Sequence, residues 1–403
     1  MRQTPARTPR LGGRPIWQIL LSVTCTALAY VAVGMPLGVL PGWLHNGLGY
    51  DAAIAGGAVS IQYVATILSR AMVGPMADRS GPRRAILIGF ACCVASGALL
   101  FSAGYGGGHA GPMIARLLAS RIMLGFSESF VSTSAIAWSI SRSGMEQTTR
   151  IISWNGIATY GALALGAPIG VFLFARGGMA MIGGATALLG VMGLLFTLPQ
   201  KATRPIKAER LPFLAVFRRV LPYGASLGLG AIGFGVVASF ITLLFTARGW
   251  ADAWIALSAF GGAFVLARLL CTRLIAARGG KQTALAFVSI EAAGLALIWI
   301  APGAVFAIVG AAIAGFGFSM LFPALAMIVV DLVPQHSRGA AIGAYSLFTD
   351  VALCVTGPLA GVLASHANYE APFVVAAMAA CAAFILLFST RYARLDAAQT
   401  LAL

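Results

Sequence analysis

The sequence predicts an all-α membrane protein with twelve transmembrane helices, arranged as two six-helix bundles related by a pseudo-two-fold axis. The first observation is composition: of 403 residues, 59% are hydrophobic and only 9% are charged, and the mean hydropathy is +0.90. Average globular domains carry about 25% charged residues. The second observation is that apolar segments of about 20 residues recur along the chain. The third is that the two halves of the sequence resemble each other, which favours two related bundles.

The apolar segments form two sets of six, separated by a basic, partly amphipathic connection at residues 199–222. The first set covers residues 16–40, 54–75, 84–104, 112–140, 151–175 and 178–198. The second set covers residues 223–246, 252–275, 282–300, 303–330, 339–365 and 371–390. We therefore expect an N-terminal bundle over 16–198, a cytoplasmic surface linker over 199–222 and a C-terminal bundle over 223–390.

The basic residues indicate which way the chain crosses the membrane. If both termini are cytoplasmic, 21 of the 27 lysines and arginines fall in cytoplasmic loops or tails, and only Arg176 and Arg248 fall in outer loops. This skew predicts that both termini lie in the cytoplasm. It also explains the net charge of +16 without a nucleic-acid partner. Residues 1–15, with four arginines and three prolines, are expected to be a disordered cytoplasmic tail, and residues 391–403 a second tail.

Two sequence offsets relate the halves. Residues 69–84 match residues 267–282 at an offset of 198, which aligns Arg70 with Arg268. GFSESF at 125–130 matches GFGFSM at 315–320 at an offset of 190.

The repeat also exposes what is unique to each half. The offset of 190 aligns Arg121 with Ala311, Glu128 with Phe318, and Asp350 with Tyr160. These charges are therefore not consequences of the repeat.

The segment Arg116–Trp138 is apolar yet carries three charged residues. Each ionised side chain near the centre of a membrane helix costs roughly 2.5–3.5 kcal/mol. Arg121 and Glu128 are seven residues apart, so they lie about 20° apart around the helix and about 10 Å apart along it. We expect both to line one polar cavity, too far apart to pair directly. Arg116 lies near the helix end, where it can snorkel to the membrane surface.

Glu128 and Asp350 fall near the middle of their spans and are the candidate proton-coupling residues, because burial favours the protonated form of a carboxyl group. The alternative is that they form fixed ion pairs. Arg121 has two roles open to it, binding an anionic group of a substrate or alternating contact with a neighbouring acid. Glu291 is expected to be a paired structural acid, and a proton-coupling role is the alternative.

Polar and aromatic side chains within the spans are candidate substrate contacts, and packing or interfacial anchoring is the alternative for each aromatic ring. The predicted substrate-binding set is Gln62, Arg121, Phe126, Asn155, Tyr160 and Tyr345. Two segments combine proline with glycine, which permits a helix to bend or rock, or fixes a static kink. The predicted bending residues are Gly166, Pro168, Gly170, Gly357, Pro358 and Gly361.

The stretch GPMADRSGPRR at 74–84 resembles the G-x-x-x-D-R-x-G-R-R signature of the major facilitator superfamily. RIMLG at 121–125 and GALALGAPIG at 161–170 resemble further elements of that superfamily, the second one typical of proton-linked antiporters. The chain as a whole resembles a bacterial inner-membrane subfamily of arabinose-type or drug efflux permeases, which implies a location in the bacterial inner membrane. The resemblance implies the major facilitator fold and a cytoplasmic latch that breaks as the protein opens inward. The gating residues expected are Gly74, Asp78, Arg79, Gly81, Arg83 and Arg84, together with the repeat-related pair Arg70 and Arg268.

Enzymatic function is not expected, because the four histidines lie in loops without partners at ligand or triad spacing, and no phosphate-binding G-x-x-x-x-G-K-[ST] loop is present. No metal or cofactor is expected. The resemblance implies a monomeric transporter that exports a small organic solute, such as a sugar, drug or metabolite, in exchange for protons. Proton-coupled uptake of a sugar or organic acid is one alternative, and transport of lipids or amphiphiles is another.

Overall fold

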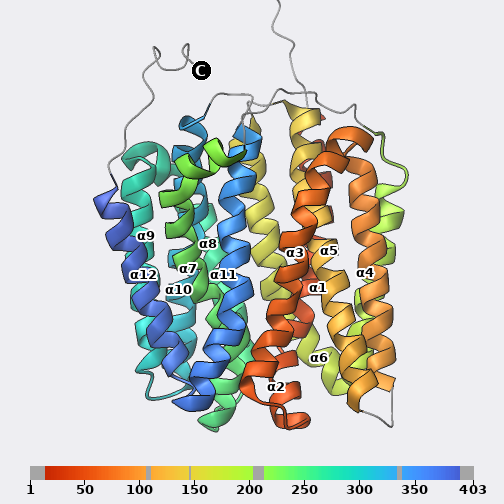
Figure 1. Cartoon of the computed structure of the whole chain (residues 1–403), viewed down its shortest axis with the longest axis vertical. Coiled ribbons are helices and arrows are strands. Elements are labelled where there is room, and N and C mark those ends of the chain that lie inside the picture. Colours follow the sequence, from red (N-terminus) through yellow and green to blue (C-terminus); the bar gives the residue numbers. More distant parts are fainter. Residues whose placement is uncertain (1–13, 106–109, 145–146, 203–212, 334–337, 391–403) are drawn as a thin grey trace, which may run out of the picture.

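The computed structural model describes residues 14–105, 110–144, 147–202, 213–333 and 338–390, and every regular element among them is helical (Figure 1). In chain order the elements are α1 (Arg14–Leu37), α2 (Leu40–Gly42), the π-helical turn η1 (Trp43–Gly47), α3 (Ala52–Ser80), α4 (Pro82–Tyr105), α5 (Ala110–Ser143), α6 (Thr148–Thr197), α7 (Phe213–Ala247), α8 (Ala253–Arg278), α9 (Gly280–Trp299), α10 (Ala304–Asp331), α11 (Arg338–His366) and α12 (Ala371–Ser389). Ten of these helices are long and apolar enough to cross a membrane. The predicted all-α class is confirmed.

Helix α5 is the long helix that falls outside those ten. It carries Arg116, Arg121 and Glu128 together with many serines, five of which are buried. Because α5 packs against α1, α3 and α4, protein rather than lipid surrounds much of its polar surface. This is how a helix with charged residues is kept within an apolar bundle.

The twelve-helix count is not confirmed, because the expected spans 151–175 and 178–198 form one element, α6. A straight helix of its 50 residues would be about 75 Å long, more than twice the roughly 30 Å of a bilayer core. The backbone leaves helical geometry at Gly177 (φ −158°, ψ 25°) and Gly178 (φ 61°, ψ −156°). The second combination is open almost only to glycine. The described residues thus contain eleven helices of 19 residues or more, one of them interrupted.

The predicted linker 199–222 differs from the structure at its end. Helix α7 begins at Phe213, so residues 213–222 are helical, and Pro222 lies inside that helix. Residues 203–212, and the greater part of both predicted tails (1–13 and 391–403), lie outside the described residues.

The helices form two bundles that lie side by side (Figure 1). Helices α1, α3, α4, α5 and α6 pack with one another, and helices α7 to α12 pack with one another. The main contacts between the bundles join α3 to α11 and α6 to α8. These two helix pairs are therefore the main places where the bundles meet.

The two halves share details of backbone geometry at repeat-related positions. Gly81 and Gly279, which each separate two helices, have φ values of 86° and 83°, in the region that favours glycine. A Cβ added at Gly125 on α5 would overlap the carbonyl oxygen of Gln62 on α3, and one added at Gly315 on α10 would overlap that of Phe260 on α8. The same pair of helices therefore crosses at the same point in each bundle.

Both proline–glycine segments allow close helix packing. Gly166 and Gly170 lie against the backbone of α1, and Gly357 lies against Gly56 of α3. Within α6 the non-helical residues are Gly177 and Gly178, about two turns beyond Pro168. The break at these two glycines lies between the expected spans 151–175 and 178–198, and Pro168 lies within helical backbone, so bending around Pro168 stays a prediction.

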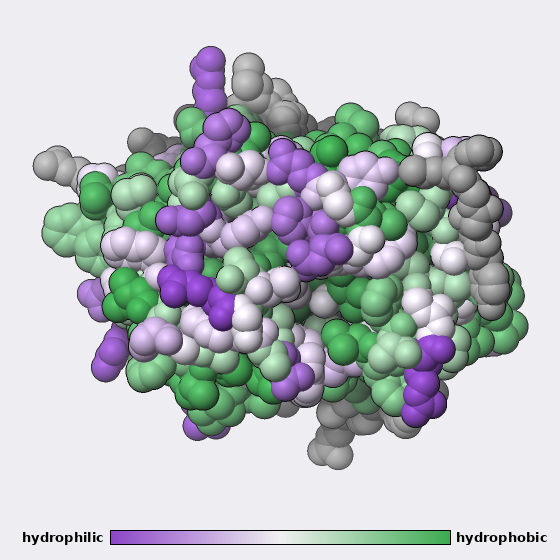
Figure 2. All heavy atoms as spheres, turned by 90° about the horizontal axis from the view of Figure 1, so that it is seen from below, coloured by the Kyte–Doolittle hydropathy of each residue, from purple (hydrophilic) through white to green (hydrophobic). Residues whose placement is uncertain are grey.

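Side-chain hydrogen bonds join the two bundles at the end of the molecule where α2 lies, which we call the α2 end (Figure 1). Ser365 of α11 donates to Asp51 (2.5 Å), and Tyr369 lies 2.7 Å from His45 across the bundles. Asn46 donates to Thr246 at 3.4 Å. Seen from this end, hydrophilic side chains gather toward the middle of the face and apolar ones occupy much of its edge (Figure 2). This distribution fits a molecule whose sides contact lipid.

Candidate functional site

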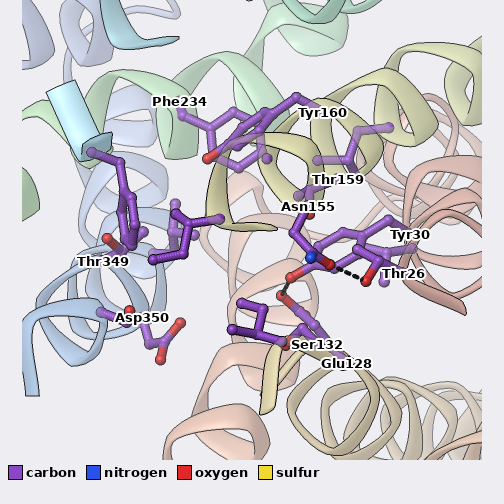
Figure 3. A pocket seen from close by; sticks show the side chains of 18 of the residues that line it. Thr26, Tyr30, Glu128, Ser132, Asn155, Thr159, Tyr160, Phe234, Thr349 and Asp350 are labelled. Atoms are coloured by element: carbon purple, nitrogen blue, oxygen red, sulfur yellow. Dashed lines mark hydrogen bonds between the residues drawn. The ribbon is translucent and has the colours of Figure 1, made fainter. Parts of the chain in front are cut away.

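A cavity of about 180 Å³ lies between the two bundles. Residues from α1, α3, α5 and α6 line one side of it, and residues from α7, α8, α10 and α11 line the other. Figure 3 shows Tyr30, Glu128 and Asn155 on one side and Thr349 and Asp350 on the other. Both bundles therefore contribute to a single site.

Glu128 of α5 is the acid of the N-terminal bundle in this cavity, and it is 6% exposed. The side-chain amide of Gln62 donates to its Oε2 at 2.6 Å. The Tyr30 hydroxyl donates to its Oε1 at 3.2 Å (Figure 3). No basic side chain among the described residues forms an ion pair with it. Glu128 is therefore held by neutral donors and lacks a cationic partner.

Asn155 of α6 lies beside this group. Thr26 of α1 donates to its Oδ1 at 2.6 Å, and its Nδ2 donates to the Ile151 carbonyl oxygen at 3.1 Å (Figure 3). Each polar atom of the amide thus makes one hydrogen bond, which holds the side chain between α1 and α6. Asn155 shapes the polar wall around Glu128, and one N–H and one lone pair of its amide have no described partner.

Arg70 and Asp350 form an ion pair across the bundles, between α3 and α11. The pair is bidentate, with Nε of Arg70 on Oδ2 and Nη2 on Oδ1 of Asp350, the second bond at 3.1 Å. Nη1 of Arg70 also donates to Thr133 at 3.3 Å. Bidentate arginine–carboxylate pairs are strong and geometrically specific, so the two charges compensate each other.

Four aromatic rings form one wall of the cavity, three of them from the C-terminal bundle and one, Tyr160, from α6. Tyr160 of α6 stacks on Phe264 of α8 with a centroid separation of 3.7 Å, and packs edge-on against Phe234 (5.5 Å) and Phe318 (5.9 Å). We call Tyr160, Phe234, Phe264 and Phe318 the aromatic cluster. Phe318 is the repeat counterpart of Glu128. The same position in the two bundles is thus polar on one side of the cavity and aromatic on the other.

Arg268 of α8, the repeat counterpart of Arg70, also lines the cavity and is 4% exposed. Its Nε donates to the Ser319 carbonyl oxygen at 2.9 Å, and its guanidinium carbon lies 5.1 Å from the Phe264 ring centroid. Its Nη1 has no partner among the described residues. In contrast to Arg70, Arg268 has no described carboxylate partner.

Comparison with known proteins identifies the family. The family model described as Major Facilitator Superfamily matches residues 23–356 and 255–400. The chain belongs to the major facilitator superfamily. It is 45% identical over 379 residues to an uncharacterized MFS-type transporter of Burkholderia mallei (strain SAVP1), covering 94% of this chain and 93% of that protein. It is 44% identical over 386 residues to one of Pseudomonas aeruginosa (strain UCBPP-PA14), covering 96% of each.

Solved structures share the fold at low sequence identity. A D-xylose-proton symporter superposes with a TM-score of 0.76 at 15% identity, covering 94% of this chain and 98% of that one. The human organic anion transporter MFSD10 (TETRAN) gives 0.69 at 16% identity, covering 93% and 99%. These results confirm the superfamily that the sequence motifs indicate, and the protein is a multi-pass membrane transporter of this superfamily.

Within this superfamily fold, the cavity contains four of the residues expected to bind substrate or protons. Glu128, Asp350, Asn155 and Tyr160 all line it. Arg70 and Arg268, which were expected to gate or pack, line it as well.

Arg121 does not line this cavity, contrary to the expectation that it shares one with Glu128. It is 1% exposed, and none of its three guanidinium nitrogens has a described partner. The reason is the crossing at Gly125, which lies between Arg121 and Glu128 on α5. There the backbone of α3 touches α5, so the cavity ends before it reaches Arg121.

Three other residues that were expected to contact substrate do not line the cavity. Gln62 is fully buried and positions Glu128 by its hydrogen bond. Tyr345 is fully buried and donates to the Phe322 carbonyl oxygen at 3.2 Å. Phe126 packs beside a small cluster with Val73 and Phe130. Each meets the periodicity of a polar or aromatic face, but a neighbouring helix covers it.

The expected latch is described in part. Arg83 donates to the carbonyl oxygens of Thr197 and Leu198, which ties the start of α4 to the end of α6. Arg84 is exposed. Gly74, Asp78 and Arg79 continue α3, but their side chains lie outside the described residues, so the predicted contacts of Asp78 and Arg79 stay predictions.

The sequence reasoning missed Thr26, Tyr30 and the phenylalanines of the aromatic cluster. Thr26 and Tyr30 are four residues apart on α1, the spacing that puts two side chains on one helix face, and this signal was available. Glu291, in contrast, is fully buried away from the cavity, and neither carboxylate oxygen has a described partner. The expectation of a paired acid is not met among the described residues.

Proposed function

We propose that this protein is a secondary active transporter that exports a small organic solute from the bacterial cytoplasm in exchange for protons, by alternating access of the cavity between its bundles. Membership of the superfamily supports transport, and the cavity supports a site within one chain, so that a monomer suffices. The skew of lysine and arginine supports an inner-membrane location with cytoplasmic termini.

The observation that carries proton exchange is the environment of Glu128. It lines the cavity, is nearly fully buried, and receives hydrogen bonds from Gln62 and Tyr30 without a basic partner. An uncompensated buried carboxylate is costly, so the site is most stable when a proton or a cationic group neutralises it. A proton and such a group exclude each other at Glu128, and this competition is the requirement for exchange.

Closure at one end supports alternating access. The hydrogen bonds from Ser365 to Asp51 and between Tyr369 and His45 join the bundles at the α2 end. Transport requires that these contacts break when the cavity opens toward that end.

Proton-coupled uptake of a sugar or organic acid is the second candidate, and Arg268 favours it. An anion bound by Arg268 would make protonation of Glu128 more favourable, because the two ligands have opposite charge. Solute and proton would then move together. The similarity to the D-xylose-proton symporter is at 15% identity and supports the fold alone.

Transport of lipids has less support. In the sequence, Arg116 was the residue that suggested lipid transport. Its guanidinium group donates to the carbonyl oxygens of Pro112 (3.1 Å) and Ser102 (2.8 Å). Arg116 therefore satisfies backbone groups near the ends of α4 and α5. It does not mark a lateral opening toward lipid.

The test is a solute screen with purified protein in liposomes that carry an imposed pH gradient. In exchange with protons a solute accumulates on the acidic side of the membrane, and in co-transport it accumulates on the alkaline side. Accumulation on the acidic side supports the proposal, whereas accumulation on the alkaline side supports the second candidate. Solute accumulation that does not change with the pH gradient would refute proton coupling.

A further inference from the structure

The charges that line the cavity do not all compensate one another. Arg70 and Asp350 pair with each other across the bundles. Glu128 on α5 and Arg268 on α8 each lack an ionic partner among the described residues. The cavity therefore presents one uncompensated negative group on the N-terminal bundle and one uncompensated positive group on the C-terminal bundle.

Arg268 is held in a way that suits an anion. Its Nε is anchored on the Ser319 carbonyl oxygen, which fixes the orientation of the guanidinium group. Its Nη1 is buried and has no described partner. A Cβ added at Gly156 of α6 would lie 2.9 Å from that same Nη1. The glycine thus leaves room for the guanidinium group against α6, and a buried unpaired cation requires an anionic partner to offset its desolvation.

The surface next to Arg268 is apolar. Phe264 lies under its guanidinium group and stacks on Tyr160, and Phe234 and Phe318 extend this aromatic cluster along the cavity. Such rings bind the apolar part of a ligand. Nothing on this wall, other than Arg268, offers an uncompensated charge among the described residues.

We propose that the transported solute is a zwitterion with an apolar body, whose cationic group binds Glu128, whose anionic group binds Arg268, and whose apolar body lies on the aromatic cluster. This inference rests on the proposed function in one respect, since the cationic group is what competes with the proton at Glu128. Such a solute bridges the two bundles and neutralises both uncompensated charges at once. Arg268 thereby becomes a specificity-determining residue.

The test uses four probes of similar size that differ in charge at pH 8. They are L-phenylalanine (zwitterion), phenethylamine (cation), 3-phenylpropionate (anion) and 3-phenylpropan-1-ol (neutral), and binding to the purified full-length protein is measured by calorimetry. We expect phenylalanine to bind about tenfold or more tightly than either singly charged probe, since each charge-assisted contact contributes at least that much. The neutral alcohol binds most weakly.

Variants assign each charge preference to one residue. Arg268→Gln abolishes the preference for phenylalanine over phenethylamine but keeps the preference over 3-phenylpropionate, and Glu128→Gln does the reverse. Arg268→Lys keeps the positive charge and restores part of the first preference. Arg273→Gln is the matched control, since Arg273 is exposed on the same helix, and it changes neither preference.

Three results would overturn the inference. Phenylalanine that binds no more tightly than the singly charged probes would exclude recognition of both charges. Variants that weaken all four probes equally would assign Arg268 a purely structural role. Failure of every probe to bind at about 10 mM, weaker than the mM range of the weakest specific ligands, would exclude this substrate class. None of these results bears on proton exchange, which the pH-gradient measurement tests separately with any transported solute.

Discussion

At the scale of single residues, the cavity depends on which charges are compensated. Asp350 has the bidentate partner Arg70, whereas Glu128 has neutral donors alone. An ion pair favours the ionised form of a carboxyl group, whereas neutral donors do so less. The two acids that the sequence placed in the same class thus differ in their partners, and this difference is why we propose Glu128 as the proton carrier.

The first prediction concerns the Arg70–Asp350 pair. Asp350→Asn leaves the guanidinium group of Arg70 without its counter-charge, and we expect a loss of about 1–3 kcal/mol in stability, measured as a lower midpoint of thermal unfolding in detergent. The double variant Arg70→Gln/Asp350→Asn regains much of that loss, because it removes both charges together. If the loss of stability in the double variant equals the sum of the losses in Asp350→Asn and Arg70→Gln alone, the two side chains do not interact, and the pairing is contradicted.

The sequence could predict which residues carry charge, but not which ones a neighbouring helix covers. Glu128, Asp350, Asn155 and Tyr160 were identified because polar groups within apolar spans need a polar environment. Arg121 meets the same criterion and is expected on the same helix face as Glu128. Its separation from the cavity depends on the crossing of α3 and α5 at Gly125, a three-dimensional contact that periodicity along one helix does not contain.

At the scale of helices, glycine determines how closely neighbouring elements approach. Gly56 of α3 and Gly357 of α11 lie in backbone contact across the two bundles. In membranes such small residues allow the close packing that stabilises helix pairs. The expected spans matched the helices well where polar loops separate them. They failed at Gly177 and Gly178, where a backbone break joins two spans without a loop, and at Phe213, where a helix begins inside an apparently basic linker.

The second prediction compares two adjacent glycines of α3. Gly56→Ala places a methyl group against the carbonyl group of Gly357, and we expect overpacking to cost about 1–3 kcal/mol. Gly57→Ala meets nothing within 4 Å, so it should leave stability unchanged or raise it by up to about 1 kcal/mol through helix propensity. Thermal unfolding of the two variants checks this, and equal effects at both positions would refute the close contact between α3 and α11.

At the scale of the whole molecule, side-chain hydrogen bonds join the two bundles at the α2 end. These contacts link residues 200 or more positions apart in the sequence, such as Asn46 with Thr246 and Asp51 with Ser365. No local pattern predicts such pairs, whereas the two-bundle architecture itself followed from the repeat and the number of apolar segments. The motion that opens this end must replace those contacts with water.

The third prediction concerns pH at this closure. The hydroxyl of Ser365, which donates to Asp51, lowers the pKa of that carboxyl group. A lowered pKa means that the contact is fully formed above the ordinary range of an aspartate and is lost as pH falls through the lowered value. Acidification through this lowered pKa, well below the ordinary aspartate pKa of about 3.9, should therefore loosen the α2 end, and Ser365→Ala should loosen it at neutral pH already.

Spin labels at two exposed positions of the α2 end, introduced by Leu48→Cys and Ala367→Cys in a background without native cysteines, report this opening as a longer inter-label distance. Asp51→Asn serves as the control that removes the titration. An inter-label distance that does not change in Ser365→Ala or on acidification would contradict the role of this hydrogen bond in closure.

The central claim is that a solute and a proton compete for Glu128, and proton release on binding tests it most directly. Purified protein in a weakly buffered solution is mixed with a transported solute, and the change in free proton concentration is recorded between pH 5 and pH 8. We predict release of about one proton per bound solute at the pH where Glu128 is protonated beforehand, because one carboxyl group titrates, and no release from Glu128→Gln at any pH. Proton uptake on binding, or undiminished release from the variant, would contradict the account.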